Sequence, residues 1–321
     1  MSKLLSVVVT SYNHAEFLPQ RLESLLAQTY RPFEIIVVDD CSTDGSLAVL
    51  RRYEEDPRVK VVSMERNSGT AAASNHGASL ASGEYLMFAE CDDFDEPTHA
   101  ERLVKALESS SAGAAFCRSR LVDERGVVLG DDFENREPAF HALCAADVLI
   151  PGALMRRFLL RACVVPNMSA ATIRKASFDA VGGLAVSAGY RLCLDWDLWN
   201  RLARREDFFY VSEPLNSFRS HAGTARSTLD VARQVREIYA VLTDAAAAMN
   251  LSPADRFRFK LGLARIWAGY FSQSPAAWIR GFSAAWAATL PYDAFSLGHL
   301  ALAAAAKAVG LRFSLAESAA R

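Results

Sequence analysis

Short apolar runs alternate with amphipathic segments over the N-terminal part of the chain. Four β-branched or aromatic runs predict strands buried inside a sheet, and they span residues 4–9, 33–38, 59–62 and 85–89. The segments between them repeat apolar residues at helical spacing. Strands that alternate with helices indicate βαβ units, so we expect an α/β fold with a doubly wound, mostly parallel sheet and helices on both faces.

The fourth run is followed directly by five acids: Glu90, Asp92, Asp93, Asp95 and Glu96. Carboxylates this close together repel one another unless a cation or solvent relieves the repulsion. In open α/β sheets, ligands bind at the edge where such a strand ends. Taken alone, the cluster fits two interpretations equally: a divalent cation that holds a diphosphate, or a solvated acidic turn before a helix.

Polar residues also follow the first and second strands, and right-handed crossovers bring these loops to the same edge as the acids. The three loops hold Thr10 and Tyr12, Asp39 and Asp40, and Asp92 and Asp93. The chain lacks both G-x-G-x-x-G and G-x-x-x-x-G-K-[ST], which argues against a dinucleotide fold of the usual kind and excludes a P-loop NTPase. Without a glycine-rich cradle, a diphosphate in this cleft would need a metal to neutralise its charge.

The middle of the chain continues the alternation less regularly. We expect a helix over 99–107, strands over 114–122, 166–173 and 208–211, and helices over 175–181 and 194–202. The pattern weakens over 131–155, where a functional lid or binding loop is expected. Asp195 stands at the start of its helix, where the dipole favours an acid, and it could equally serve as a general base. Asp197 is expected to pack or pair structurally.

Alanine-rich helical periodicity dominates beyond residue 228. We therefore divide the chain into a catalytic domain, 1–227, and an all-helical C-terminal extension, 228–321. Trp278, Phe282 and Trp286 share one helical face, and basic residues lie nearby. Such helices either pack as a plain extension or make a peripheral contact with anionic lipid headgroups.

Composition narrows the class of protein. An apolar fraction of 51% and a charged fraction of 22% are those of a globular chain with ample core. A net charge of −2 gives no pull toward nucleic acid, so no nucleic-acid partner is expected. Six cysteines without a C-x-x-C pair indicate reduced thiols. With no signal peptide or spanning segment evident, we expect a cytoplasmic protein, with the inner face of the membrane as its further location.

Five features of the chain match the motifs of a known family: SVVVTSYNHAEFL, EIIVVDDCSTDGS, the Asn67…Gly69…Asn75…Gly77 spacing, GEYLMFAECDD, and VGGLAVSAGYRLCLDWDLWNRLA. They resemble the inverting glycosyltransferases of family 2, which have the GT-A fold. The likeness covers about residues 4–225. It implies transfer of a hexosyl or N-acetylhexosaminyl group from a nucleotide-diphospho-sugar, with a UDP-sugar as the first guess. The acceptor would be a saccharide or a lipid-linked saccharide, in bacterial surface or extracellular polysaccharide assembly.

The resemblance also implies roles for particular residues. Donor-binding residues would be Thr10, Tyr12, Asp39, Asp40, Asn67, Gly69 and Asp92. Mg²⁺ or Mn²⁺ would be held by Asp93, Asp92 and His221, and Asp195 would be the catalytic base. Glu90 departs from the D-x-D-D pattern of the family, because it puts a longer acid at the first position.

The Arg-x-His ending, Arg219 to His221, completes the resemblance. An arginine there suits a diphosphate, and the histidine can bind metal or phosphate. The remaining histidines are expected to be structural: His14, His76, His99, His141 and His299.

Two other classes of function use similar features. A nucleotidyltransferase acting on sugar phosphates would use the same kind of fold and metal, but the first strand is not followed by a triphosphate loop rich in Gly, Arg and Lys. A non-catalytic sugar-nucleotide-binding protein is the other alternative, and Glu90 favours it while Asp93 and Asp195 argue against it.

Overall fold

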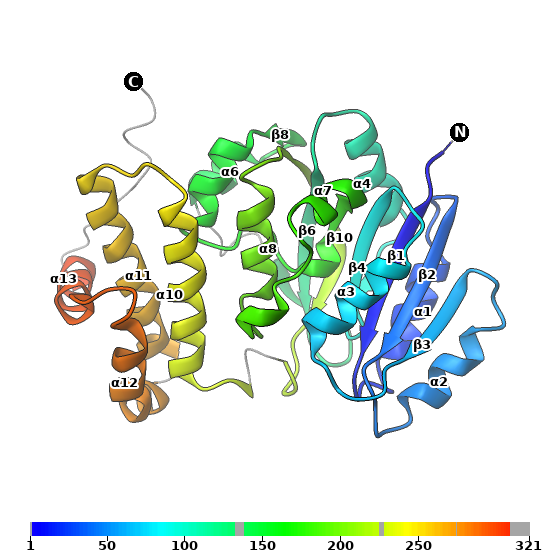
Figure 1. Ribbon diagram of the computed structural model, residues 1–321, viewed down its shortest axis with the longest axis horizontal. Coiled ribbons are helices and arrows are strands. Elements are labelled where there is room, and N and C mark those ends of the chain that lie inside the picture. Colours follow the sequence, from blue (N-terminus) through cyan, green and yellow to red (C-terminus); the bar gives the residue numbers. More distant parts are fainter. Residues whose placement is uncertain (1, 132–137, 225–227, 274, 309–321) are drawn as a thin grey trace. The chain divides into compact units, whose positions relative to one another are not determined.

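The computed structural model describes residues 2–131, 138–224, 228–273 and 275–308, and it divides into two compact units (Figure 1). The first unit comprises Met1–Arg156 and Cys163–His221, and the second comprises Arg157–Ala162 and Ala222–Arg321. The division predicted after residue 227 falls outside the described residues. Each unit is described separately below.

The first unit is built on one mixed sheet whose strand order is β3-β2-β1-β4-β9-β6-β10-β5. Its parallel half consists of the four predicted strands: β1 (Leu5–Ser11), β2 (Phe33–Asp39), β3 (Val59–Ser63) and β4 (Tyr85–Glu90). β1, β2 and β4 are almost entirely buried because helices cover both of their faces, which is why each of the three reads as an apolar run. β3 alternates buried and exposed residues, with Lys60 exposed.

The rest of the sheet departs more from the prediction. Its strands are β5 (Phe94–Asp95), β6 (Ala114–Val122), β7 (Val128–Asp131), β8 (Val148–Ile150), β9 (Ala171–Arg174) and β10 (Phe208–Arg219). The strand expected over 166–173 starts later, because Asn167 caps a 3₁₀ turn, η1 (Met168–Ala170), by accepting the Ala170 N–H at 2.8 Å. β10 is much longer than predicted, because it pairs with β6 on both sides of an irregularity at Pro214.

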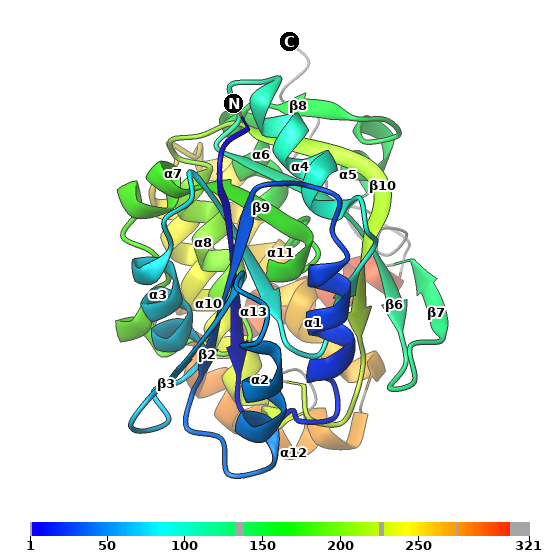
Figure 2. The same ribbon diagram turned by 90° about the vertical axis from the view of Figure 1, so that its right-hand side faces the viewer.

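Helices cover both faces of this sheet, as predicted (Figure 1, Figure 2). Apolar residues of α1 (Leu18–Leu26), α2 (Ser46–Tyr53) and α4 (His99–Glu108) form one core with the odd-numbered side chains of β1 and β2. On the other face, α3 (Thr70–Leu80) packs Ala73 against Ile36 and Val38. A Cβ on Gly77 would meet Val8 Cγ1 at 2.4 Å, so α3 lies unusually close to β1.

Several shorter elements complete the unit. They are α5 (Pro138–Leu143), the first residues of α6 (Gly152–Leu159), α7 (Lys175–Ala180), η2 (Val186–Ala188) and α8 (Leu194–Leu202). The stretch 131–155, expected to be irregular, thus contains short regular elements among its described residues. Helix α8 is fixed from inside, because the buried Trp199 lies edge-on to Phe208 of β10.

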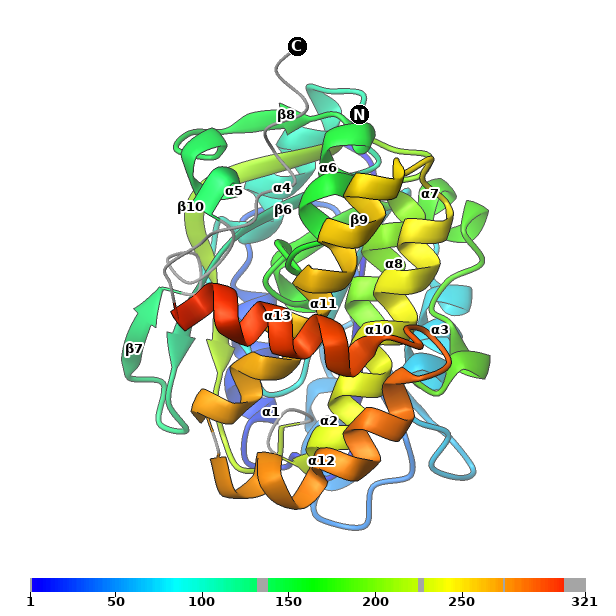
Figure 3. The same cartoon turned by 90° about the vertical axis from the view of Figure 1, so that its left-hand side faces the viewer.

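The second unit is helical in its described part, as predicted for the C-terminal extension (Figure 3). Helix α10 (Val231–Ala247) packs on α12 (Pro275–Thr289), and α11 (Pro253–Gln273) packs on α13 (Ser296–Ala308). Trp267 is buried and stacks on Phe282 with ring centroids 5.5 Å apart. The side chain of Trp278 lies outside the described residues. None of the described helices combines the length and the apolarity needed to cross a bilayer.

Candidate active site

The carboxyl ends of β1, β2 and β4 form one edge of the sheet. Thr10 lies between Val38 and Glu90 in the parallel register, and Ser11 lies beside Asp39. The loops that follow these strands therefore start side by side, and the polar residues predicted to converge do start from adjacent positions.

The loop after β1 is locked onto the loop after β2. Asn13 has a positive φ of 56°, and its side-chain oxygen accepts the N–H groups of Thr43 at 2.8 Å and Asp44 at 3.3 Å. His14 donates its own N–H to Ser46 Oγ at 3.1 Å. These bonds fix the backbone that presents Tyr12, whose side chain is 41% exposed.

Asp39 and Asp40 bind backbone N–H groups of the loops at the same edge of the sheet. Asp40 is buried, and its two oxygens accept the N–H groups of Ser68 and Gly69, each at 2.8 Å. It thereby holds the loop 67–69, in which Gly69 needs its positive φ of 84°. Asp39 accepts the Ser42 N–H at 3.0 Å, while its buried Oδ1 has no hydrogen-bond partner among the described residues.

Glu90 lies within electrostatic reach of three other carboxyl groups, those of Asp92, Asp93 and Asp195. Burial, followed by the charges of Asp93, Asp92 and Asp195, raises the pKa of Glu90 well above its usual value. Burial and the charge of Asp92 raise the pKa of Asp93 to about 7. The region therefore takes up protons, or a cation, more readily than separate carboxylates would.

Asp195 reaches this region from the first turn of α8. Its Oδ1 accepts the Trp196 N–H at 2.7 Å, which orients the carboxylate at the helix N-terminus. Asp197 is engaged differently, because its Oδ2 lies 2.7 Å from Arg201 Nη2. Arg201 in turn donates to the carbonyls of Val181 and Gly183, so Asp197 has the structural role predicted for it.

A histidine that we expected to be structural lies beside the acids. His14, Asp92 and His221 can each supply one ligand atom such that all three atoms lie within 4.8 Å of one another. His221 Nε2 is 2.9 Å from Asp92 Oδ2. Burial opposes ionisation of Asp92, but the His221 hydrogen bond and the charge of His14 lower its pKa below the usual value.

Asp93 is not in that three-residue group, as far as the described residues show. Its Oδ1 accepts the Arg219 N–H at 3.0 Å, whereas its Oδ2 is buried without a hydrogen-bond partner in the described part of the chain. The one signal for His14 in the sequence was its place in the loop after the first strand, next to Tyr12.

The expectation that Arg219 binds a diphosphate is wrong. Its guanidinium is buried and donates to the carbonyl oxygens of Asp92 at 2.7 Å and Glu124 at 2.6 Å. The third nitrogen donates to Gln20 Oε1 at 2.5 Å. Because each of its nitrogens already has a protein acceptor, Arg219 shapes the loop after β4 and leaves no arm for a ligand.

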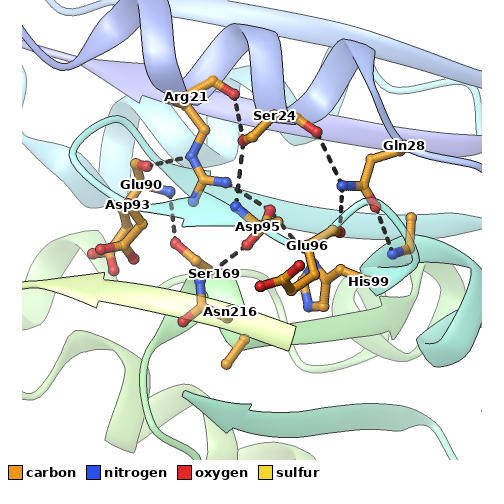
Figure 4. A network of polar contacts seen from close by, with 12 residues as sticks. Arg21, Ser24, Gln28, Glu90, Asp93, Asp95, Glu96, His99, Ser169 and Asn216 are labelled. Carbon is orange, nitrogen blue, oxygen red and sulfur yellow. Dashed lines mark hydrogen bonds and ion pairs between the residues drawn. The ribbon is translucent and has the colours of Figure 1, made fainter. Parts of the chain in front are cut away.

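A second buried cation supports the acids from the α1 side (Figure 4). Arg21 is fully buried, with Nη1 2.6 Å from Asp95 Oδ2 and Nε donating to the Glu90 carbonyl at 2.8 Å. Asn216 donates to the other oxygen of Asp95 at 3.0 Å, and His99 Nδ1 lies 3.4 Å from Oδ2. The charge of Arg21 opposes the upward shift in the pKa values of Glu90 and Asp93. Sequence reasoning missed this network, whose members lie on three distant segments.

Known proteins resemble this chain both in sequence and in fold. A sequence profile described as glycosyl transferase family 2 matches residues 6–140, which span the first four strands and the acidic loop. This match covers fewer than half of the 321 residues, and it agrees with the resemblance found in the sequence. The mixed α/β fold is of the predicted GT-A type.

Proteins similar in sequence include TuaG of Bacillus subtilis, a teichuronic acid biosynthesis glycosyltransferase, which is 35% identical over 127 residues. That match covers 39% of this chain and half of the length of TuaG. Among solved structures, S. aureus TarS in complex with UDP-GlcNAc superimposes with a TM-score of 0.67 at 15% identity, over 97% of this chain and 93% of TarS. The mannosyltransferase PcManGT from Pyrobaculum calidifontis, in complex with GDP-Man and Mn²⁺, superimposes with a TM-score of 0.56 at 19% identity. That match covers 97% of this chain and 89% of PcManGT.

Proposed function

We propose that this chain is an inverting, metal-assisted glycosyltransferase that moves a sugar from a nucleotide-diphospho-sugar to an acceptor hydroxyl. The observation that carries the proposal is the meeting of two acidic groups at one sheet edge: Glu90, Asp92 and Asp93 from the end of β4, and Asp195 from α8. One group can serve a cation and a diphosphate, and the other can serve an incoming hydroxyl.

The donor end of the site is formed by the locked loops after β1 and β2. Thr10 and Tyr12 would meet the base and ribose, with Asp40 holding the loop of Asn67 and Gly69 against them. Asp39 would support that loop from beneath. The complexes of TarS with UDP-GlcNAc and of PcManGT with GDP-Man support a nucleotide-sugar donor, with a UDP-linked hexosyl or N-acetylhexosaminyl group as the first choice.

The residues beside the donor fit a divalent cation. Two ligands about 2.1 Å from an ion and at right angles to each other lie about 3.0 Å apart, and His221 Nε2 lies 2.9 Å from Asp92 Oδ2. The unpartnered Oδ2 of Asp93 offers a further oxygen. Asp92, Asp93 and His221 would therefore hold Mg²⁺ or Mn²⁺, which when bound neutralises charge on the leaving diphosphate.

Asp195 would act as the general base. Inverting transfer needs one carboxylate to take the proton of the acceptor hydroxyl as its oxygen attacks the anomeric carbon. The Trp196 N–H holds Oδ1 of Asp195 and so fixes the direction of the other oxygen. Because attack and departure occur in one step, no covalent enzyme intermediate is required.

The acceptor is proposed to be a saccharide or a lipid-linked saccharide in bacterial surface or extracellular polysaccharide assembly. The similarity to TuaG, a teichuronic acid biosynthesis glycosyltransferase, supports this proposal. The domain assignment follows from it: residues 1–227 would bind donor and carry out catalysis, and residues 228–321 would form a helical extension.

We also propose that the helical extension touches a lipid surface on the cytoplasmic side. From Gly281 to Ala305 the only acidic or basic side chains are Asp293 and His299. Asp293 is buried between Lys260, 3.2 Å away, and His299, 2.6 Å away, so this acid is neutralised. Phe295 is 75% exposed and Leu302 is 51% exposed. An uncharged, apolar surface with Arg280 exposed at its start suits an anionic bilayer surface.

Calorimetric titration with nucleotides tests the proposed activity. Full-length protein titrated with UDP, GDP and UTP, with and without Mn²⁺, is expected to bind one diphosphate in a metal-dependent manner. Binding of the triphosphate alone would favour a nucleotidyltransferase. Binding of a diphosphate without turnover of its sugar conjugate, over a panel of saccharide acceptors, would favour a non-catalytic binding protein.

A further inference from the structure

His14 is the one member of the candidate metal group that the sequence motifs do not explain. We propose that His14 is a third protein ligand of the divalent cation, so that the ion is held by two imidazoles and the Asp92 carboxylate. This set favours a first-row transition-metal ion such as Mn²⁺ over Mg²⁺. This inference rests on the proposed metal-assisted transfer, because that reaction gives the ion its function. The ligand set of the ion can nevertheless be tested by metal binding alone.

The geometry brings ligand atoms from three separate loops together. His14 follows β1, Asp92 follows β4 and His221 follows β10, and their ligand atoms lie within 4.8 Å of one another. The rings of His14 and His221 meet edge to face with centroids 5.7 Å apart. Two nitrogens and one oxygen are thus close enough together that one ion could bind all three.

The tautomer of His14 suits coordination. Its Nδ1 lies 2.7 Å from the carbonyl oxygen of Tyr12, which can only accept a hydrogen bond. Nδ1 must therefore carry the proton, and in a neutral imidazole the lone pair is then on Nε2. Metal-binding histidines usually have this arrangement, in which the second ring nitrogen donates to a carbonyl or carboxylate and fixes the ring.

The protein holds the His14 ring in place before any ion arrives. The backbone of His14 is anchored to Ser46, and the preceding residue, Asn13, is held in its left-handed conformation by bonds to Thr43 and Asp44. The ring of Phe17 packs against both imidazoles, with centroids 6.0 Å from His14 and 5.1 Å from His221. This apolar wall keeps the two rings from turning to solvent.

The donor atoms decide which ion is preferred. Mg²⁺ prefers oxygen ligands and gives up its waters reluctantly, whereas imidazole nitrogen binds transition-metal ions more strongly. A site with two imidazoles gains little from Mg²⁺.

Mn²⁺ binding measured by electron paramagnetic resonance tests the proposal without relying on activity. Full-length protein is titrated with Mn²⁺ alone and with Mn²⁺ plus UDP, and echo-envelope spectra count the directly bound nitrogens. We expect two ¹⁴N couplings in the native protein and one in His14→Ala. The affinity of the variant for Mn²⁺ should fall at least about tenfold, and its affinity for Mg²⁺, measured by competition, should change less than about twofold.

His76→Ala is the matched control, because His76 is an exposed histidine on α3 in the same unit, and it should leave both couplings intact. Unfolding of His14→Ala in the presence of chelator checks that the variant folds, and His14→Gln, which keeps a polar side chain of similar reach, provides a second variant. Two couplings retained in His14→Ala, or a single coupling in the native protein, would overturn the inference while leaving metal-assisted transfer intact. No Mn²⁺ binding with or without UDP would also overturn it, and sugar transfer that persists in chelator would separately refute the metal part of the proposed function.

Discussion

Asp195 and Asp197 stand two residues apart in the first turn of α8, yet their surroundings differ. Asp197 is paired with Arg201, which binds the turn after α7, whereas the charge of Asp195 acts on Glu90. A helix turns by about 200° over two residues, so the two side chains point to different faces. We therefore propose that Asp195, and not Asp197, meets the acceptor.

We therefore expect Asp195→Asn to lower the rate of sugar transfer by at least about 100-fold, because the amide cannot accept the hydroxyl proton. Its affinity for the nucleotide diphosphate should stay within about twofold of native. Asp197→Asn is the control, and it should reduce thermal stability more than the rate measured at low temperature. An equal loss of donor affinity and turnover in Asp195→Asn would contradict the assignment as base.

Asp93 makes the stability of the metal-free protein depend on pH. Its pKa is raised from 3.8 to about 7 on folding, so the folded chain binds this proton more tightly than the unfolded chain does. The stabilisation is present at acidic pH and is lost as the pH rises from about 4 to about 7. The measurement is urea unfolding in the presence of chelator. Between pH 4.5 and pH 8, the free energy of unfolding of the native protein should fall by on the order of 3 kcal/mol more than that of Asp93→Asn. If stability depends on pH in the same way in both proteins, the pKa of Asp93 is not raised on folding.

At the scale of elements, the contact between α3 and β1 helps to position the backbone of the candidate site. Asn75 of α3 exchanges two hydrogen bonds with the backbone of Leu184, at 2.8 and 2.9 Å, and so connects α3 with the segment before α8. Gly77 allows this helix to lie against Val8, in the middle of the strand that leads to Thr10. The position of α3 thus bears on both ends of the site.

Gly77→Ala should consequently destabilise the first unit by about 1–3 kcal/mol, because the added methyl would overlap Val8. Gly130→Ala is a suitable control in the same unit, since no atom lies within 4 Å of a Cβ there, and it should change stability by less than about 0.5 kcal/mol. Denaturant unfolding measures both. Equal stability of the two variants would mean that α3 can move away from β1 at little cost.

At the scale of the whole molecule, the chain combines a mildly acidic body with a mildly basic extension. Residues 228–321 hold ten Lys/Arg against six Asp/Glu, while the whole chain has a net charge of −2. An extension of this kind suits an anionic surface better than the body does. The two units are also built differently, since one rests on a mixed sheet and the other on helices alone.

The double variant Phe295→Ser/Leu302→Ser should bind vesicles of mixed neutral and anionic lipid about tenfold more weakly than the native protein in co-sedimentation, because it loses exposed apolar area. Val128→Ser, which removes an apolar side chain exposed by 57% in the first unit, should bind as the native protein does. If the native protein does not sediment with vesicles, the lipid contact is refuted. If the double variant changes the sedimentation coefficient of the free protein, a second copy of the chain covers this surface.

The sequence by itself determined the parallel half of the sheet and the edge at which the site lies. Strands buried on both faces must be apolar throughout, and crossover handedness then decides which loops meet, so Thr10, Asp39 and Asp92 could be assigned to one edge from pattern alone. The helix of Asp195 followed from its apolar spacing. Each of these features depends on local periodicity, which the sequence displays directly.

Only the tertiary structure decided what the individual polar side chains do. Arg219 seemed suited to a ligand, but three carbonyls and an amide oxygen from distant segments take up its guanidinium. Arg21 and Asp95 are 74 residues apart, and neither sequence segment predicts their ion pair. His14 joined Asp92 and His221 for the same reason. Hydrogen bonds and ion pairs act over about 3–4 Å in space whatever the separation along the chain, so partners brought together by the fold leave no periodic signal in the sequence.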